Sequence, residues 1–130
     1  MKLGYTIIYV PNVYASLSFF ENAFGLPRRF LHESGDYGEL ETGETTLAFA
    51  SLDLGGMNFP VGFVAASESS KPLGMEIALV TPSVVDAHAK ALAAGAIELK
   101  APETKPWGQV VSYVRCPDGN LVEICSPIGG

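Results

Sequence analysis

The feature that most constrains the fold is an internal repeat. A strand-like segment, a helical segment and three further strand-like segments occur in that order twice along the 130 residues. Pro11-Asn12 precedes the first helical segment, and Pro82-Ser83 precedes the second, 71 residues later. Repetition at this scale indicates two copies of one supersecondary unit, neither of which closes a hydrophobic core alone.

Side-chain periodicity separates the helices from the strands. Apolar residues recur at helical spacing in residues 13–24 and 84–94, and Gly25 and Gly95 end these segments. The remaining segments are rich in β-branched and aromatic residues and are bounded by turn residues. We therefore predict an α+β fold of two tandem βαβββ modules. The predicted strands are residues 5–10, 28–33, 37–42, 45–51, 75–81, 97–101, 109–115 and 121–125.

The chain is expected to form a single domain, residues 1–130. With 48 % apolar residues, a chain of this length buries a sizeable core. The first module is assigned to residues 1–52 and the second to residues 74–128, with a bridge at residues 53–73. Because the bridge is rich in Gly and Ser and has no clear periodicity, we expect a loop that lines a pocket.

Charge and hydropathy narrow the choice of partners. The 14 acidic and 8 basic residues give a net charge of −6, and phosphate binding needs clustered Lys and Arg, so no nucleic-acid partner is expected. No apolar run approaches the roughly 20 residues of a membrane span. The N-terminus lacks the pattern of a signal peptide, and we expect a cytoplasmic location.

The two cysteines are expected to be inert thiols. Cys116 and Cys125 flank the turn Pro117-Asp118-Gly119-Asn120, which predicts a hairpin. In the expected register Cys125 lies opposite a residue near Val111, too far along the strand from Cys116 for a disulfide. Because Cys-x-x-Cys spacing is absent, a zinc site built from cysteine is excluded.

Two segments carry a family resemblance. The first runs from Tyr9-Val10-Pro11-Asn12-Val13 into a helix that ends at Phe24-Gly25, and the second is the closing hairpin. With the duplicated module order, they resemble the vicinal oxygen chelate superfamily, which includes glyoxalase I, extradiol dioxygenases and the bleomycin- and fosfomycin-resistance proteins. The resemblance implies a glyoxalase/bleomycin resistance-like fold, in which two modules form a curved mixed sheet around a cleft, within a homodimer. The closing segment reads Trp107-Gly108-Gln109, then Val114-Arg115-Cys116-Pro117-Asp118-Gly119-Asn120-Leu121-Val122-Glu123.

The resemblance also implies where a metal would bind. The family takes one side chain from the first and last strands of each module, and the matching positions are Tyr5, Ala48, Glu76 and Glu123. Of these four residues, only the two glutamates are usual metal ligands, and none of the four offers a nitrogen ligand. We therefore expect no cofactor. A divalent metal held by Glu76 and Glu123 is the alternative.

Strand alternation places these four positions on the face that lines the cleft. Tyr9 extends this face, and Trp107 follows Pro106 in a loop expected at the cleft mouth. Glu76 and Glu123 are expected to bind a cationic or hydrogen-bonding group, or to act as a coupled acid–base pair. The third interpretation is a structural role. The predicted ligand-binding residues are Tyr5, Tyr9, Ala48, Glu76, Trp107 and Glu123.

Histidine-based chemistry has no support in the sequence. His32 is expected at the surface or rim, and His88 on the solvated side of the second helix. No catalytic residue is assigned. The leading hypothesis is a metal-independent small-molecule-binding protein of the glyoxalase/bleomycin-resistance type, with an organic ligand in a homodimeric cleft. The alternative is a divalent-metal-dependent lyase, isomerase or dioxygenase of the same superfamily.

Overall fold

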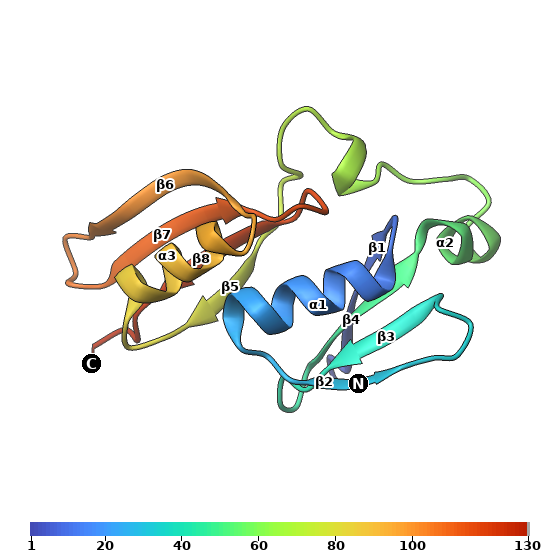
Figure 1. The fold of residues 1–130 in the computed structure, drawn as a ribbon, viewed down its shortest axis with the longest axis horizontal. Coiled ribbons are helices and arrows are strands. Elements are labelled where there is room, and N and C mark those ends of the chain that lie inside the picture. The colour runs from blue at the N-terminus through green and yellow to red at the C-terminus, as the bar shows by residue number, and fades with distance from the viewer. Residues whose placement is uncertain (130) are drawn as a thin grey trace.

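The fold consists of two lobes, each built from a four-stranded sheet and one long helix (Figure 1). A computed structural model of the chain describes residues 1–129, and Gly130, the last residue of the predicted domain, lies outside them. The first module comprises β1 (Tyr5–Val10), α1 (Val13–Phe24), β2 (Arg28–Leu31), β3 (Tyr37–Leu40) and β4 (Thr46–Ser51). The second comprises β5 (Ile77–Val80), α3 (Val84–Ala93), β6 (Ile97–Thr104), β7 (Val110–Arg115) and β8 (Leu121–Cys125).

The two sheets have the same topology. The strand order is β1-β4-β3-β2 in the first sheet and β5-β8-β7-β6 in the second. In each sheet the first strand of the module pairs in parallel with the last, and the other pairs are antiparallel. The predicted α+β fold of two βαβββ modules is thus confirmed. In the described part of the chain, however, hydrogen bonds unite the strands into two sheets rather than one.

Local signals position the helices where the sequence predicts them. Asn12 caps α1, because its side-chain oxygen accepts a hydrogen bond from the Ala15 N–H at 2.9 Å. Gly25 ends the helix with φ at 68°, a left-handed conformation that glycine adopts without strain. Ser83 occupies the N-cap position of α3, but its hydroxyl donates to the Asp86 carboxylate at 2.7 Å instead of capping the backbone.

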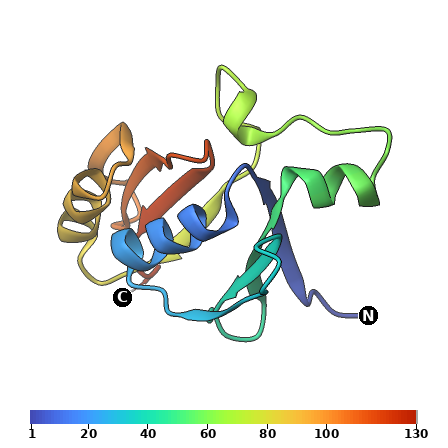
Figure 2. The same cartoon turned by 45° about the vertical axis from the view of Figure 1, so that its right-hand side comes forward.

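A single hydrophobic core joins the two modules. Helix α1 lies between the two sheets and packs against α3 (Figures 1 and 2). One cluster of buried side chains draws on both modules, so each module covers apolar surface of the other, as the repeat predicts. Prominent members of this core are Val10, Leu17, Phe20 and Phe49 from the first module and Val84, Ala91, Val122 and Ile124 from the second.

The bridge contains more regular structure than the sequence predicts. The segment after β4 forms a short helix, α2 (Leu52–Asn58), and a 3₁₀ turn, η1 (Ala66–Glu68), follows it. Ser51 caps α2 by accepting a hydrogen bond from the Leu54 N–H at 3.1 Å. The prediction of a loop was therefore wrong for α2. Its two central glycines disfavour a helix and mask this signal.

Candidate functional site

Each sheet has one face packed on the helices and an opposite face, here called the outer face. In β8, Val122 and Ile124 are buried in the core, so Leu121, Glu123 and Cys125 lie on the outer face. Neighbouring strands share this alternation through their register. The structure thereby confirms the predicted assignment of faces in this strand.

A pair of carboxylates lies on the outer face of the second sheet. Glu76 immediately precedes β5 and is exposed, whereas Glu123 is partly buried in the middle of β8. Partial desolvation of its carboxyl group raises the pKa of Glu76, and the neighbouring Glu123 carboxylate raises it further. Tyr113 faces Glu123 across the β7–β8 ladder, and its hydroxyl donates to Glu123 Oε1 at 3.0 Å. Burial beside this carboxylate raises the pKa of Tyr113 to about 12.

No cation compensates this carboxylate pair within the described residues. The ion pairs of residues 1–129 involve other carboxylates, and none of them includes Glu76 or Glu123. The register places Ala78 directly beside Glu123, and the Val111–Cys125 pair is the next on this face. The site therefore combines apolar surroundings with excess negative charge, which favours an incoming cation, proton or hydrogen-bond donor.

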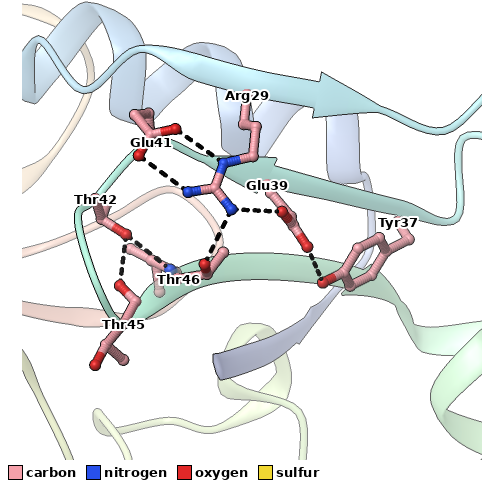
Figure 3. Close-up of polar contacts among 8 residues, drawn as sticks. Arg29, Tyr37, Glu39, Glu41, Thr42, Thr45 and Thr46 are labelled. Atoms are coloured by element: carbon pink, nitrogen blue, oxygen red, sulfur yellow. Dashed lines mark hydrogen bonds and ion pairs between the residues drawn. The ribbon is translucent and has the colours of Figure 1, made fainter. Parts of the chain in front are cut away.

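The outer face of the first sheet holds a second tyrosine–glutamate pair, and this one is neutralised (Figure 3). Glu39 is only 7 % exposed and accepts a hydrogen bond from the Tyr37 hydroxyl at 2.7 Å. The Arg29 guanidinium donates to Glu39 at 3.2 Å and to the Thr46 hydroxyl at 3.2 Å. It also donates to both carboxylate oxygens of Glu41, each at 2.9 Å.

The charges within this network stabilise one another. The hydrogen bond from Arg29 lowers the pKa of Glu41. Burial raises the pKa of Tyr37, and the Glu39 carboxylate raises it further. Because the buried carboxylate already has an internal cation and an internal hydroxyl, the first sheet needs no external partner to balance it.

The other predicted site residues are spread over both modules. Tyr5 lies in the first sheet, opposite Thr46, and is 58 % exposed. Ala48 is fully buried between its ladder neighbours Ile7 and Glu39, so its methyl group is closed to a ligand. The ring of Tyr9 stacks on the ring of Phe63 in the bridge.

Trp107 lies in the exposed loop between β6 and β7, where its Nε1–H donates to Gln109 Oε1 at 2.9 Å. The hydrogen bonds and ring contacts of residues 1–129 join none of Tyr5, Tyr9 and Trp107 to the carboxylate pair. Of the predicted site residues, Glu76 and Glu123 are therefore the two that interact directly with each other.

Sequence reasoning missed four polar residues of the outer faces. Tyr37 and Glu39 lie two residues apart in β3, so period-two spacing was a signal for placing them on one face. Tyr113 follows from the hairpin register, because placing Cys125 opposite Val111 puts Tyr113 opposite Glu123. Arg29 gave no such signal, because the β2–β3 register shifts between Arg28 and Phe30. The four missed residues are Arg29, Tyr37, Glu39 and Tyr113.

The predicted solvated position of His88 was wrong. The side chain is buried, with Nδ1 at 2.9 Å from the Ser112 hydroxyl and Nε2 at 2.8 Å from the Glu98 carboxylate. His88 lies four residues after Val84 and three before Ala91, on the buried stripe of α3. His32 is exposed, as predicted.

The cysteines are unpaired, as predicted. Cys125 lies opposite Val111, and both Cys116 and Cys125 are buried free thiols. Burial raises the pKa of both thiols, that of Cys125 to about 11. A thiol with a raised pKa is a poor nucleophile at neutral pH.

The residues do not fit the metal site that the family resemblance implies. At the four matching positions, Ala48 has no donor atom and Tyr5 offers a phenol in place of a nitrogen ligand, which leaves Glu76 and Glu123 as the usual ligands among the four. Within residues 1–129, no group of three or more His, Cys, Asp or Glu side chains could hold a metal ion. Two carboxylates without a nitrogen or sulfur ligand are a poor match for zinc, nickel or iron sites.

Comparison with known proteins places this geometry in a family. Residues 2–124 match the family model described as Glyoxalase/Bleomycin resistance protein/Dioxygenase superfamily. The chain therefore belongs to this superfamily, which confirms the resemblance read from its motifs. A search of curated proteins gave no match.

Solved structures share the fold at low sequence identity. A glyoxalase-related enzyme from Fulvimarina pelagi has a TM-score of 0.82 at 20 % identity, covering 98 % of this chain and 88 % of that one. A glyoxalase/bleomycin resistance protein/dioxygenase family enzyme from Burkholderia phytofirmans PsJN has a TM-score of 0.79 at 22 % identity, covering 97 % and 98 %. At these identities the likeness establishes the fold alone.

None of the helices in residues 1–129 has both the length and the apolar character needed to cross a membrane.

Proposed function

We propose that this chain is a metal-independent small-molecule-binding protein, in which Glu76 and Glu123 contact the cationic group of an organic ligand. One observation carries the proposal. Two neighbouring carboxylates lie on an apolar sheet face, and no ion pair of residues 1–129 neutralises them. A ligand cation would relieve their mutual repulsion and form charge-assisted hydrogen bonds.

A second copy of the chain is proposed to complete the cleft. The outer faces expose apolar side chains, including Tyr5 and Ile7 on the first sheet and Val80 on the second. The accessible surface is 7555 Å², whereas a folded monomer of this size is expected to expose about 6,600 Å². The excess is comparable to the roughly 800 Å² that each partner buries in a standard interface.

Strand edges support the same assembly. Among the described residues, β1 pairs only with β4, and β5 pairs only with β8, so each keeps one free edge. Sedimentation velocity tests the proposal, with a dimer expected for the natural sequence. Replacing Ile7 with Lys in the exposed apolar face is expected to shift the protein to the monomer. A monomer at all concentrations would contradict a homodimeric cleft.

Binding of the ligand is tested by a thermal-shift screen of cationic and planar aromatic compounds, followed by calorimetry of the compounds that stabilise the protein. Glu123→Gln is expected to weaken cation binding about tenfold or more, because a charged hydrogen-bond partner is lost. Glu44→Gln, an exposed turn residue, is the matched control and is expected to bind normally. Equal affinity of Glu123→Gln and the natural protein would overturn the proposal.

The rival function is a divalent-metal-dependent lyase, isomerase or dioxygenase. It is supported by Glu76 and Glu123, which occupy two of the positions where the superfamily places ligands. Metal analysis separates the two functions. Stoichiometric Mn, Fe, Ni or Zn that is lost in Glu123→Gln would favour the rival.

A further inference from the structure

A small apolar cavity lies where the two modules meet, beneath the bridge. Its volume is about 170 Å³. Ile7 and Tyr9 of β1 line one side, and Met75 and Leu121 of the second module line the other. Phe63 and the residues that follow it in the bridge complete the lining. Apolar cavities of about 150 Å³ accept a benzene ring, so this volume suits one aromatic ring.

Specific contacts hold the bridge over the cavity. The Phe63 ring stacks on the Tyr9 ring with centroids 4.8 Å apart. A side chain at Gly55 would come within 3 Å of both rings, so glycine makes this stacking possible. The absence of a side chain at Gly119 likewise allows η1 to approach, because a Cβ there would lie 2.3 Å from the Ala66 carbonyl oxygen.

Arg115 fixes the other end of the bridge to the closing hairpin. Its guanidinium donates to the carbonyl oxygens of Ala66 at 3.0 Å, Ser69 at 2.8 Å and Ser70 at 3.3 Å. It also donates to the Gly119 carbonyl oxygen at 3.1 Å. With both ends anchored, the cavity is a built feature of the fold.

The cavity borders the carboxylate pair. Leu121, which lines the cavity, and Glu123 lie two residues apart on the outer face of β8, a spacing of about 7 Å. Met75, which also lines it, directly precedes Glu76. Apolar and anionic recognition surfaces therefore adjoin within one chain.

We propose that the ligand is an amphipathic organic cation, whose apolar ring occupies this cavity while its positive group contacts Glu76 and Glu123. The inference rests on the proposed function and adds the class of ligand to it. A short alkyl chain between ring and cation spans the distance from Leu121 to Glu123. Burial of the ring supplies affinity that a bare cation lacks.

Calorimetry with two matched probes tests the inference. Phenylpropylamine carries both groups, and propylamine carries the cation alone. The natural protein is expected to bind phenylpropylamine at least about tenfold more tightly, because the ring is removed from water. Leu121→Trp, which fills the cavity, is expected to abolish this advantage. Val85→Trp on the exposed surface of α3 is the matched control and is expected to keep the advantage.

The outcomes separate this inference from the function on which it rests. Equal affinity for the two amines, or a ring advantage that survives in Leu121→Trp, would overturn the cavity assignment. Amine binding that persists in Glu123→Gln would overturn the proposed function instead. A second measurement needs no variant. Nuclear Overhauser contacts from the ring protons to the methyl groups of Ile7 and Met75 are expected in the natural protein, and contacts to other residues alone would contradict the assignment.

Discussion

The outer faces of the two sheets carry the same pair of groups in different surroundings. In the first sheet the Tyr37 hydroxyl donates to Glu39, and in the second the Tyr113 hydroxyl donates to Glu123. Arg29 neutralises the buried Glu39, whereas the partly buried Glu123 has a second carboxylate beside it. A buried charge must be paired for the chain to fold. A more exposed pair can be balanced by water or by a ligand.

The ladder register explains why the two faces differ. Ala48 and Glu123 hold corresponding places, since each lies on the last strand of its module beside the first strand. In the first sheet the carboxylate lies one strand further along, because Glu39 is the β3 residue opposite Ala48. That shift brings the carboxylate within reach of Arg29 on β2. The strand that carries the glutamate, β3 for Glu39 and β8 for Glu123, thus determines whether an arginine of the same chain reaches its carboxylate.

Removing the internal cation is expected to have the largest effect. Arg29→Met leaves Glu39 buried without a countercharge and is expected to lower the free energy of unfolding by more than any other change proposed for the two faces. Urea unfolding at neutral pH measures the change. Adding Glu39→Gln to this variant removes the buried charge and is expected to restore part of the loss. A free energy of unfolding of Arg29→Met equal to that of the natural protein would show that Glu39 needs no cation.

The two tyrosines offer a matched test of the same comparison. Tyr37→Phe removes a donor from a buried carboxylate and is expected to cost about 1–2 kcal/mol. Tyr113→Phe acts on a partly exposed carboxylate that water can reach, and is expected to cost less than about 1 kcal/mol. Thermal and urea unfolding of both variants check the order. A larger loss of stability for Tyr113→Phe would contradict the inference that the buried Glu39 depends more on its tyrosine than the partly exposed Glu123 does.

Much of the fold could be predicted because its signals are local. Asn12 and Gly25 mark the ends of α1, and the turn before Leu121 sets the register that pairs Cys125 with Val111. The same register already implies the contact between Tyr113 and Glu123. The carboxylate pair was found because charged residues interrupt apolar strands.

The remaining features depend on packing that the sequence pattern does not specify. Helix α3 is rich in alanine, so its buried side is poorly defined by hydropathy, and His88 could be assigned to either side. Arg29 reaches Glu39 from a strand whose register shifts at that point. The cavity beneath the bridge depends on long-range contacts, such as those of Arg115 with Ala66 and Ser69.

The smallest expected effect concerns the uncompensated pair and its pH dependence. The pKa of Glu76 is raised in the folded protein, so between its ordinary value and the raised value the folded state binds more protons than the unfolded state. Stability therefore falls as pH rises through this window. Glu76→Gln cannot ionise and lacks this fall. It is expected to be more stable than the natural protein at pH 7 by about 0.5 kcal/mol, after allowance for solvent screening.

This advantage of Glu76→Gln is expected to disappear below about pH 4, where the carboxyl group is protonated in both folded and unfolded states. Urea unfolding of both proteins between acidic and neutral pH measures it, with Glu44→Gln as the control for loss of an exposed charge. The same ionisation affects ligand binding. A bound cation favours the charged form of Glu76, so the Glu76 carboxyl group must lose its proton when the cation binds. Cation affinity should therefore rise over the pH range in which stability falls. A stability difference that is constant with pH would mean that Glu123 does not perturb Glu76, and the contrast between the two faces would then rest on Arg29 alone.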